Sequence, residues 1–198
     1  MFCAPSVRRT AGSLAIGAAV AVLTAAPSVV AAPMSTGRSC AYADTPVGHA
    51  PSAATRAAVV CLINRDRSRW HLPALSDNGR LDRAALEFSN RLVGRGLFAH
   101  DDTGARVSRA GYRWAAVGEN IATGYPTPGQ VVRAWMASAG HCRNILDPGY
   151  RNLGVGFNRH PVRGAANRPG TWTVDFGRRQ GQHAGSSNSG PADSCPHG

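Results

Sequence analysis

The spacing of apolar residues predicts three helices in the central part of the chain. Apolar side chains recur at i, i+3 and i+4 over residues 53–69 and again over 79–94, and Pro73 separates the two segments. A third helix is predicted over residues 127–138. The residues that form these apolar stripes are Val59, Leu62, Ile63, Leu81, Ala85, Phe88, Leu92, Val131, Val132, Trp135 and Met136.

Short polar signals indicate where these helices begin and end. Ser76 or Asp77 is expected to cap the second helix. Thr127, with Gln130 three residues later, matches a capping box at the start of the third. Gly140 is expected to end that helix, because glycine is a weak helix former.

The hydrophobic period changes to two near the C-terminal end. Apolar and polar residues alternate over residues 152–158 and again over 171–176, which predicts two half-buried strands. The Gly- and Pro-containing segment 159–170 joins them as a hairpin. Asp175 alternates with apolar neighbours, so it is expected on the solvent face. Helices followed by a terminal hairpin indicate an α+β fold built in layers.

The N-terminal residues have the layout of a secretory signal peptide. Arg8 and Arg9 precede an apolar run over residues 15–26, and small residues follow over 29–32. The run is shorter than the roughly 20 residues that a membrane-spanning helix needs. We expect cleavage after Ala31, and therefore a secreted, extracellular protein.

The whole chain divides into four segments by composition. Residues 1–31 form the signal peptide, and residues 32–52 form a flexible arm rich in Ala, Ser and Pro. One domain spans 53–178, a length that suits a single core, and 179–198 is a Gly/Ser-rich tail. No later segment is apolar enough to be a transmembrane helix, and we expect a monomer.

All of the 22 basic residues are arginine, against 11 acidic residues. The formal net charge is +11, or +9 once Arg8 and Arg9 leave with the signal peptide. Such a charge attracts polyanions, including cell-wall polymers and anionic lipid surfaces. The arginines are scattered and are not interleaved with aromatic residues, so nucleic acid is not an expected partner.

Four cysteines follow the predicted cleavage site, and an even number in an exported chain indicates two disulfides. Three pairings are open, of which we favour Cys40–Cys61 and Cys142–Cys195. The first would tie the N-terminal arm to the first helix, and the second would tie down the tail. Zinc ligation is the alternative, but the chain has no C-x-x-C pair.

Two histidines and a glutamate stand out as candidate chemistry: His100, Glu119 and His141. An imidazole and a carboxylate together can share a proton, hold a metal ion or stabilise a fold. The familiar nucleophile-elbow, metalloprotease, phosphate-loop and dinucleotide motifs are absent from the sequence.

Several ordered motifs resemble the CAP superfamily of cysteine-rich secretory, antigen 5 and pathogenesis-related proteins, and in particular its bacterial, SCP-like branch. The resemblance covers residues 53–177 and implies a CAP fold, an α-β-α sandwich with a small antiparallel sheet between helical layers. The segments that carry it are Phe98-Ala99-His100, Gly118-Glu119-Asn120-Ile121, residues 131–146, residues 153–157 and residues 172–177.

The resemblance also implies a cleft, which some relatives line with two histidines and two acids that bind a divalent metal. His100, Glu119 and His141 match three of these positions, and Ser138 stands where the second acid would be. The candidate ligand-binding cleft is therefore His100, Glu119, Ser138 and His141. His100 and His141 are the candidate ligands for zinc or another divalent metal. A structural role for each of the three matching side chains is the alternative.

Three functional hypotheses follow. The first is a secreted binding module for a lipid, a wall component or a protein. The second is a hydrolase, metal-assisted or using His100, Glu119 and His141 as general acid–base candidates. The third is a structural exoprotein held to the cell wall by its basic surface. The sequence favours a non-enzymatic role and names no cofactor.

Overall fold

The computed structural model describes residues 39–184 and 195–196. The predicted signal peptide and the first part of the predicted arm lie outside the described residues. The elements follow in the order α1 (Ser52–Arg69), β1 (Ser76–Asp77), α2 (Gly79–Arg95), α3 (Thr103–Arg109), β2 (Trp114–Thr123), α4 (Pro128–Met136), α5 (Ala139–Leu146), β3 (Asn152–Asn158) and β4 (Thr171–Arg179).

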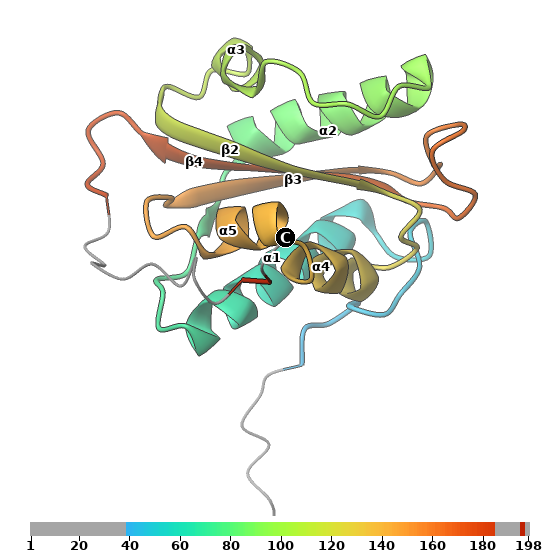
Figure 1. The fold of residues 1–198 in the computed structure, drawn as a ribbon, viewed down its shortest axis with the longest axis horizontal. Helices are drawn as coiled ribbons and strands as arrows, with labels where there is room; N and C mark the ends of the chain where they lie inside the picture. The colour runs from blue at the N-terminus through green and yellow to red at the C-terminus, as the bar shows by residue number, and fades with distance from the viewer. Residues whose placement is uncertain (1–38, 185–194, 197–198) are drawn as a thin grey trace, which may run out of the picture. The chain divides into compact units, whose positions relative to one another are not determined.

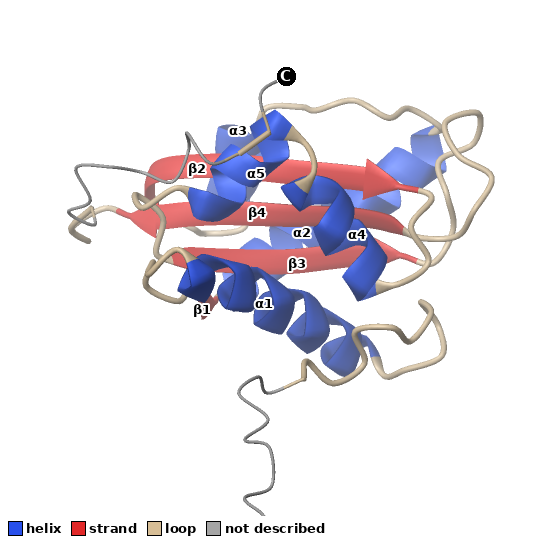
Figure 2. Ribbon diagram, turned by 60° about the horizontal axis from the view of Figure 1, so that its bottom comes forward, coloured by secondary structure: helices blue, strands red, loops and turns tan. Residues whose placement is uncertain are grey.

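The elements form three layers, as the α-β-α sandwich prediction requires. Helices α1, α4 and α5 lie on one face of a single sheet, and α2 and α3 lie on the other (Figure 1). The turned view separates the strands and shows α1, α4 and α5 side by side in front of them (Figure 2). The α+β class is therefore confirmed.

The sheet has the order β1-β3-β4-β2, so β2 is an edge strand. The predicted hairpin of β3 and β4 is confirmed, and β2 adds to the other side of β4, also antiparallel. The short β1 pairs with β3 in parallel, so the sheet is mixed, where the expectation was purely antiparallel. In the register of β2 and β4, Glu119 lies opposite Asp175.

The prediction of half-buried strands is wrong. All residues of β3 from Asn152 to Gly156 and of β4 from Thr171 to Gly177 are buried. The reason is that helices cover both faces of the sheet. Trp172, Val174 and Phe176 belong to the main core, while the Thr173 hydroxyl accepts a hydrogen bond from the Ser89 hydroxyl of α2 at 2.9 Å.

The helix boundaries follow the sequence closely, but two of the predicted signals are wrong. Asn78, and not Ser76 or Asp77, caps α2, since its side chain accepts from the Arg80 N–H at 3.1 Å. Gly140 lies inside α5 and does not end a helix. The break falls at Ser138, whose extended backbone separates α4 from α5.

Other signals are confirmed. Thr127 caps α4 by accepting from the Gln130 N–H at 3.2 Å. The two favoured disulfides form, Cys40–Cys61 and Cys142–Cys195. Ahead of α1, Val47 donates its N–H to the Pro126 carbonyl at 2.8 Å, which attaches this segment to the start of α4.

Two glycines of β3 allow α2 to approach the sheet closely. A Cβ added at Gly154 would meet the backbone of Leu81 and Asp82, and one added at Gly156 would meet the backbone of Ala85 and Leu86. The Asp82 carboxylate also accepts from the Val155 N–H at 2.8 Å. Backbone cannot move aside as a flexible side chain can, so these positions fix the spacing between α2 and β3.

We therefore predict that Gly156→Ala lowers the free energy of unfolding by about 2–3 kcal/mol, since the added methyl overpacks the α2–β3 contact. Urea denaturation followed by circular dichroism measures this change.

Gly94→Ala is the matched control on α2, because a Cβ there meets open space. It should leave stability unchanged or raise it by up to about 1 kcal/mol through helix propensity. Equal effects of the two substitutions would contradict close α2–β3 packing.

Candidate functional site

The segment around Glu119 lies on the edge strand β2, where both helical layers can reach it. Gly118 leaves room for Tyr150, whose hydroxyl lies where a Cβ would stand. Asn120 donates from Nδ2 to the His141 carbonyl at 3.0 Å, and Asn144 donates to the Glu119 carbonyl at 3.0 Å. Gly118, Glu119 and Asn120 thus each make a different contact with α5 or with the segment that follows it.

Glu119 is buried and binds His100 from the loop between α2 and α3. His100 Nδ1 lies 2.5 Å from Glu119 Oε1. The His100 side chain is 56% exposed and that of Glu119 only 3%. An Nδ1–H that donates to the carboxylate leaves Nε2 as the nitrogen that faces outward.

Arg106 of α3 forms the centre of the buried charge. Its guanidinium pairs with Glu119 and Asp101, and with Asp175 Oδ1 at 2.6 Å. It also lies over the Phe88 ring, 4.0 Å from the ring centroid, a cation–π arrangement. A buried arginine that bridges strand and loop carboxylates fixes α3 against the sheet.

Asp175 is fully buried, so its predicted place on the solvent face is wrong. The face of β4 that carries Asp175 is covered by α2 and α3. Burial raises the pKa of Asp175 to about 7, Arg106 opposes this shift, and Glu119 adds to it. Among the described residues its Oδ2 has no hydrogen-bond partner.

His141 stands on α5 and pairs with Ser138, the other residue of the predicted cleft. Its Nδ1 lies 2.9 Å from Ser138 Oγ. Burial lowers the pKa of His141, and the charge of nearby His100 lowers it further. The imidazole is therefore neutral near pH 7.

Ser138 and His141 line a cavity of about 300 Å³ beside the C-terminal half of β2. The other lining residues are mostly apolar or aromatic, while polar and apolar atoms contribute about equally to the surface of the wall. The complete lining is Phe98, Ile121, Ala122, Thr123, Tyr125, Ala134, Trp135, Ser138, His141 and Ala165. Glu119 and His100 do not line this pocket, although His100 is near enough to His141 to lower its pKa.

The donor set does not fit the divalent metal that the resemblance implies. Both Glu119 oxygens are engaged, one by His100 and the other by Arg106. A guanidinium bound to that carboxylate repels a cation that would share it. Within residues 39–184 and 195–196, no group of three or more His, Cys, Asp or Glu side chains is arranged to hold a metal ion.

Arg106, Asp101 and Asp175 are the members of the site that the sequence reasoning missed. Arg106 is one of many scattered arginines, and nothing in its neighbourhood marks it as buried. The position of Asp175 in a predicted strand was informative, because an acidic side chain there must either face solvent or pair with a cation. The helices that cover both faces of the sheet exclude solvent, which leaves the cation.

The raised pKa of Asp175 predicts a dependence of stability on pH. The folded protein keeps this proton up to about pH 7, whereas the unfolded chain releases it near the ordinary value of 3.8. Stability from this group should therefore fall as pH rises from about 4 to 7, by up to about 1.4 kcal/mol per pH unit. Urea denaturation across this range measures the slope.

Asp175→Asn should remove that slope, while the exposed control Asp44→Asn should keep it. Parallel stability curves for the parent and Asp175→Asn would contradict a protonated Asp175.

Comparison with known proteins adds a family and a set of relatives. The model of the cysteine-rich secretory protein family, CAP, matches residues 60–176. YkwD of Bacillus subtilis, an uncharacterized protein, is 36% identical over 104 residues, which cover 50% of this chain and 40% of the relative. The chain thus spans well under two thirds of that protein's length.

Solved structures agree on the fold. An extracellular protein of Bacillus anthracis that contains an SCP domain is 26% identical, with a TM-score of 0.56 over 64% of this chain and 41% of its own. An outer surface protein of Borrelia burgdorferi is 20% identical, with a TM-score of 0.54 over 62% and 90% of the two chains, and supports the fold alone. The family match covers more than half of the sequence, and the chain belongs to the cysteine-rich secretory protein (CAP) family.

Proposed function

We propose that this CAP domain is an extracellular binding module whose pocket beside His141 takes a ligand with an apolar body and one polar group. The observation that carries the proposal is the cavity of about 300 Å³, in which a His–Ser pair lies among mostly apolar and aromatic residues. Pockets of this kind bind small molecules by apolar burial and use few polar groups to orient them.

The entrance of the pocket supports an apolar ligand. Phe98, which lines the cavity, is 39% exposed, and its neighbour Leu97 is 60% exposed. Exposure of large apolar side chains to water is unfavourable, and a lipid-like ligand that covers them would remove this cost. Both belong to the loop that also holds His100.

The polar corner is suited to an uncharged or hydrogen-bonding group. His141 is neutral near pH 7, because burial lowers its pKa. Together with the Ser138 hydroxyl it offers both donors and acceptors to one ligand group. A lipid with a hydroxyl or a protonated acid at one end has this pattern.

An extracellular location is part of the proposal. Two disulfides are typical of exported domains. A relative that is 26% identical is described as an extracellular protein that contains an SCP domain. No helix in the described part of the chain is long and apolar enough to cross a membrane.

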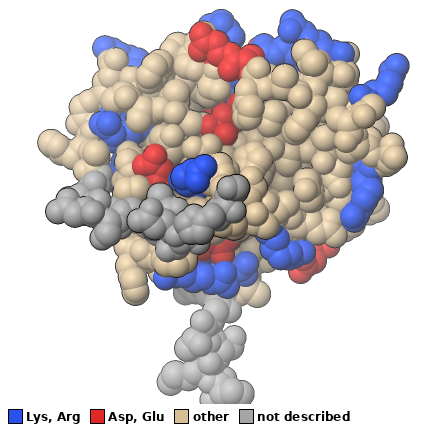
Figure 3. Space-filling model, viewed as in Figure 1, with Lys and Arg blue, Asp and Glu red and all other residues tan. Residues whose placement is uncertain are grey.

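The basic surface supports only a non-specific electrostatic attachment to a cell wall. On the face that Figure 3 shows, arginines lie apart around the rim, with acidic residues between them. Scattered charges of this kind give a salt-sensitive, non-specific attraction. In this proposal the surface charge attracts the domain to wall polymers, and the pocket supplies the specificity.

We predict that the purified protein binds tritiated cholesterol or palmitate below their aggregation limits, and that Ala134→Phe and His141→Ala each weaken binding at least tenfold. Ala134→Phe fills the cavity, and His141→Ala removes its polar corner. Filter binding measures the affinity, and circular dichroism checks the fold. Arg109→Gln, an exposed change outside the pocket, should bind as the parent does.

Affinity should also depend on pH in one direction. An apolar ligand desolvates His141 further and so lowers its pKa again, which means that binding opposes protonation. Affinity should fall as pH drops through the pKa of His141, which burial places below the ordinary histidine value of 6.5. Affinity that is constant between pH 5 and 8, or binding retained by both pocket variants, would contradict the assignment of the ligand to this pocket.

One observation favours a second candidate, a hydrolase with His100 as general acid–base. A buried carboxylate orients the exposed imidazole through a 2.5 Å contact, as catalytic histidines require. Glu119 then positions His100 and does not itself act as the base. Hydrolysis of peptide or wall-polymer substrates that His100→Gln abolishes, with the fold intact, would support this role, and unchanged activity would exclude it.

A further inference from the structure

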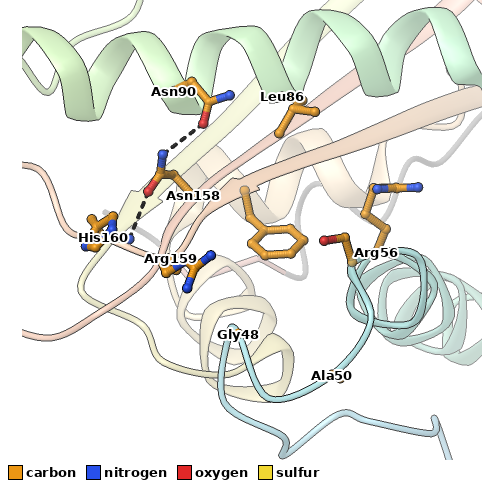
Figure 4. Close-up of a pocket in the computed structure, with 10 residues that line it drawn as sticks. Gly48, Ala50, Arg56, Leu86, Asn90, Asn158, Arg159 and His160 are labelled. Atoms are coloured by element: carbon orange, nitrogen blue, oxygen red, sulfur yellow. Dashed lines mark hydrogen bonds between the residues drawn. The ribbon is translucent and has the colours of Figure 1, made fainter.

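A second cavity, of about 390 Å³, lies away from the His/Glu cluster and shares no residue with the pocket beside His141. It is formed where the loop before α1, the first turns of α1, the middle of α2 and the end of β3 meet (Figure 4). Its lining is Gly48, Ala50, Ser52, Arg56, Leu86, Asn90, Phe157, Asn158, Arg159 and His160.

The charge of this cavity has one sign. Arg56 and Arg159 come from different elements and flank it from opposite sides (Figure 4). No Asp or Glu lines it. Across the described residues neither guanidinium forms a salt bridge, although Arg56 is near enough to lower the pKa of Asp82. Two arginines across one cavity, neither of them in a salt bridge within the described residues, favour an anionic ligand.

The amide side chains are arranged to offer donors. The His160 backbone N–H donates to Asn158 Oδ1 at 2.9 Å, which fixes the orientation of that amide. Asn158 Nδ2 in turn donates to Asn90 Oδ1 at 2.8 Å. Both oxygens thus accept a hydrogen bond, and within the described part of the chain the remaining N–H groups of Asn90 and Asn158 have no partner, so they can donate to a ligand rich in acceptors.

An aromatic side chain adds an apolar surface to this set. Phe157 is half-buried, and its ring packs against Trp172 with centroids 5.3 Å apart. It is therefore held in place while part of it lines the cavity. A fixed ring beside donors suits the apolar face of a sugar ring, whose polarised C–H groups pack on the negative face of an aromatic system.

From these observations we propose that this cavity binds an acidic saccharide, a sugar ring that carries a carboxylate or a phosphate. Arg56 and Arg159 hold the anion, Asn90 and Asn158 donate to ring and hydroxyl oxygens, and Phe157 packs against the ring. The site does not depend on the proposed function of the pocket beside His141, because the two cavities use separate residues.

The test is a titration of the 15N-labelled full domain, followed by the amide shifts of residues 157–160. The probes are glucuronate, glucose 6-phosphate, glucose, inorganic phosphate and adenosine monophosphate. Glucuronate or glucose 6-phosphate should shift these amides in a saturable way, and the pair reports whether carboxylate or phosphate is preferred. Glucose should bind at least tenfold more weakly than the better acidic sugar, since it lacks the anion.

Variants assign the binding to the cavity. The double variant Arg56→Gln/Arg159→Gln should weaken the acidic sugar at least tenfold, as expected for loss of charge-assisted hydrogen bonds. Arg109→Gln removes an exposed arginine outside this cavity and should bind as the parent does. The same spectra show that each variant is folded.

Four results would overturn the proposal. They are no shift at residues 157–160 with either acidic sugar, equal weakening by Arg109→Gln, inorganic phosphate binding as tightly as glucose 6-phosphate, and tighter binding of adenosine monophosphate. The second would mean general charge attraction, the third a simple anion site, and the fourth a nucleotide site.

Discussion

Glu119 and Asp175 face each other across β2 and β4, and Arg106 lies between their carboxylates. Two carboxylates directly opposite on neighbouring strands would repel each other, and both of these groups are buried. The raised pKa of Asp175 keeps that group protonated below about pH 7, so Arg106 pairs with Glu119, binds Asp175 and at the same time attaches α3 and the loop that holds His100. The layer formed by α2 and α3 can therefore close over the sheet. Loss of Arg106 would leave the buried Glu119 carboxylate without its cationic partner, a change that typically costs about 3–5 kcal/mol.

This ionic cluster also determines how the side chains of the CAP motifs are arranged here. One oxygen of the Glu119 carboxylate contacts His100 and the other accepts from Arg106, and this guanidinium disfavours a cation at the same carboxylate. His141, on the other helical layer, instead pairs with Ser138 beside a cavity lined mostly by apolar and aromatic residues.

The two cavities lie at separate places on the domain and differ in charge. The pocket beside His141 has a neutral imidazole among mostly apolar and aromatic residues, whereas the cavity beside Phe157 has two arginines and no acid. An apolar ligand is retained by burial, which salt does not screen, and an anionic one by charge, which salt does screen. A single small domain can therefore combine a lipid-type ligand with an acidic saccharide without competition between them.

The sequence by itself determined the elements whose signals are local. The apolar stripes placed α1, α2 and α4, the Thr127 cap placed the start of α4, and the period of two placed the β3–β4 hairpin. The even cysteine count and the family motifs indicated both disulfides and the sandwich. Such features depend on residues a few positions apart, or on a resemblance that spans the domain. The strand β2, the burial of Asp175 and the role of Arg106 were decided only by the tertiary structure. These features depend on helices that cover both faces of the sheet, and on contacts of Arg106 with Glu119 and Asp175, which are 13 and 69 residues away in the chain. Contacts between such distant residues leave no periodic pattern in the sequence.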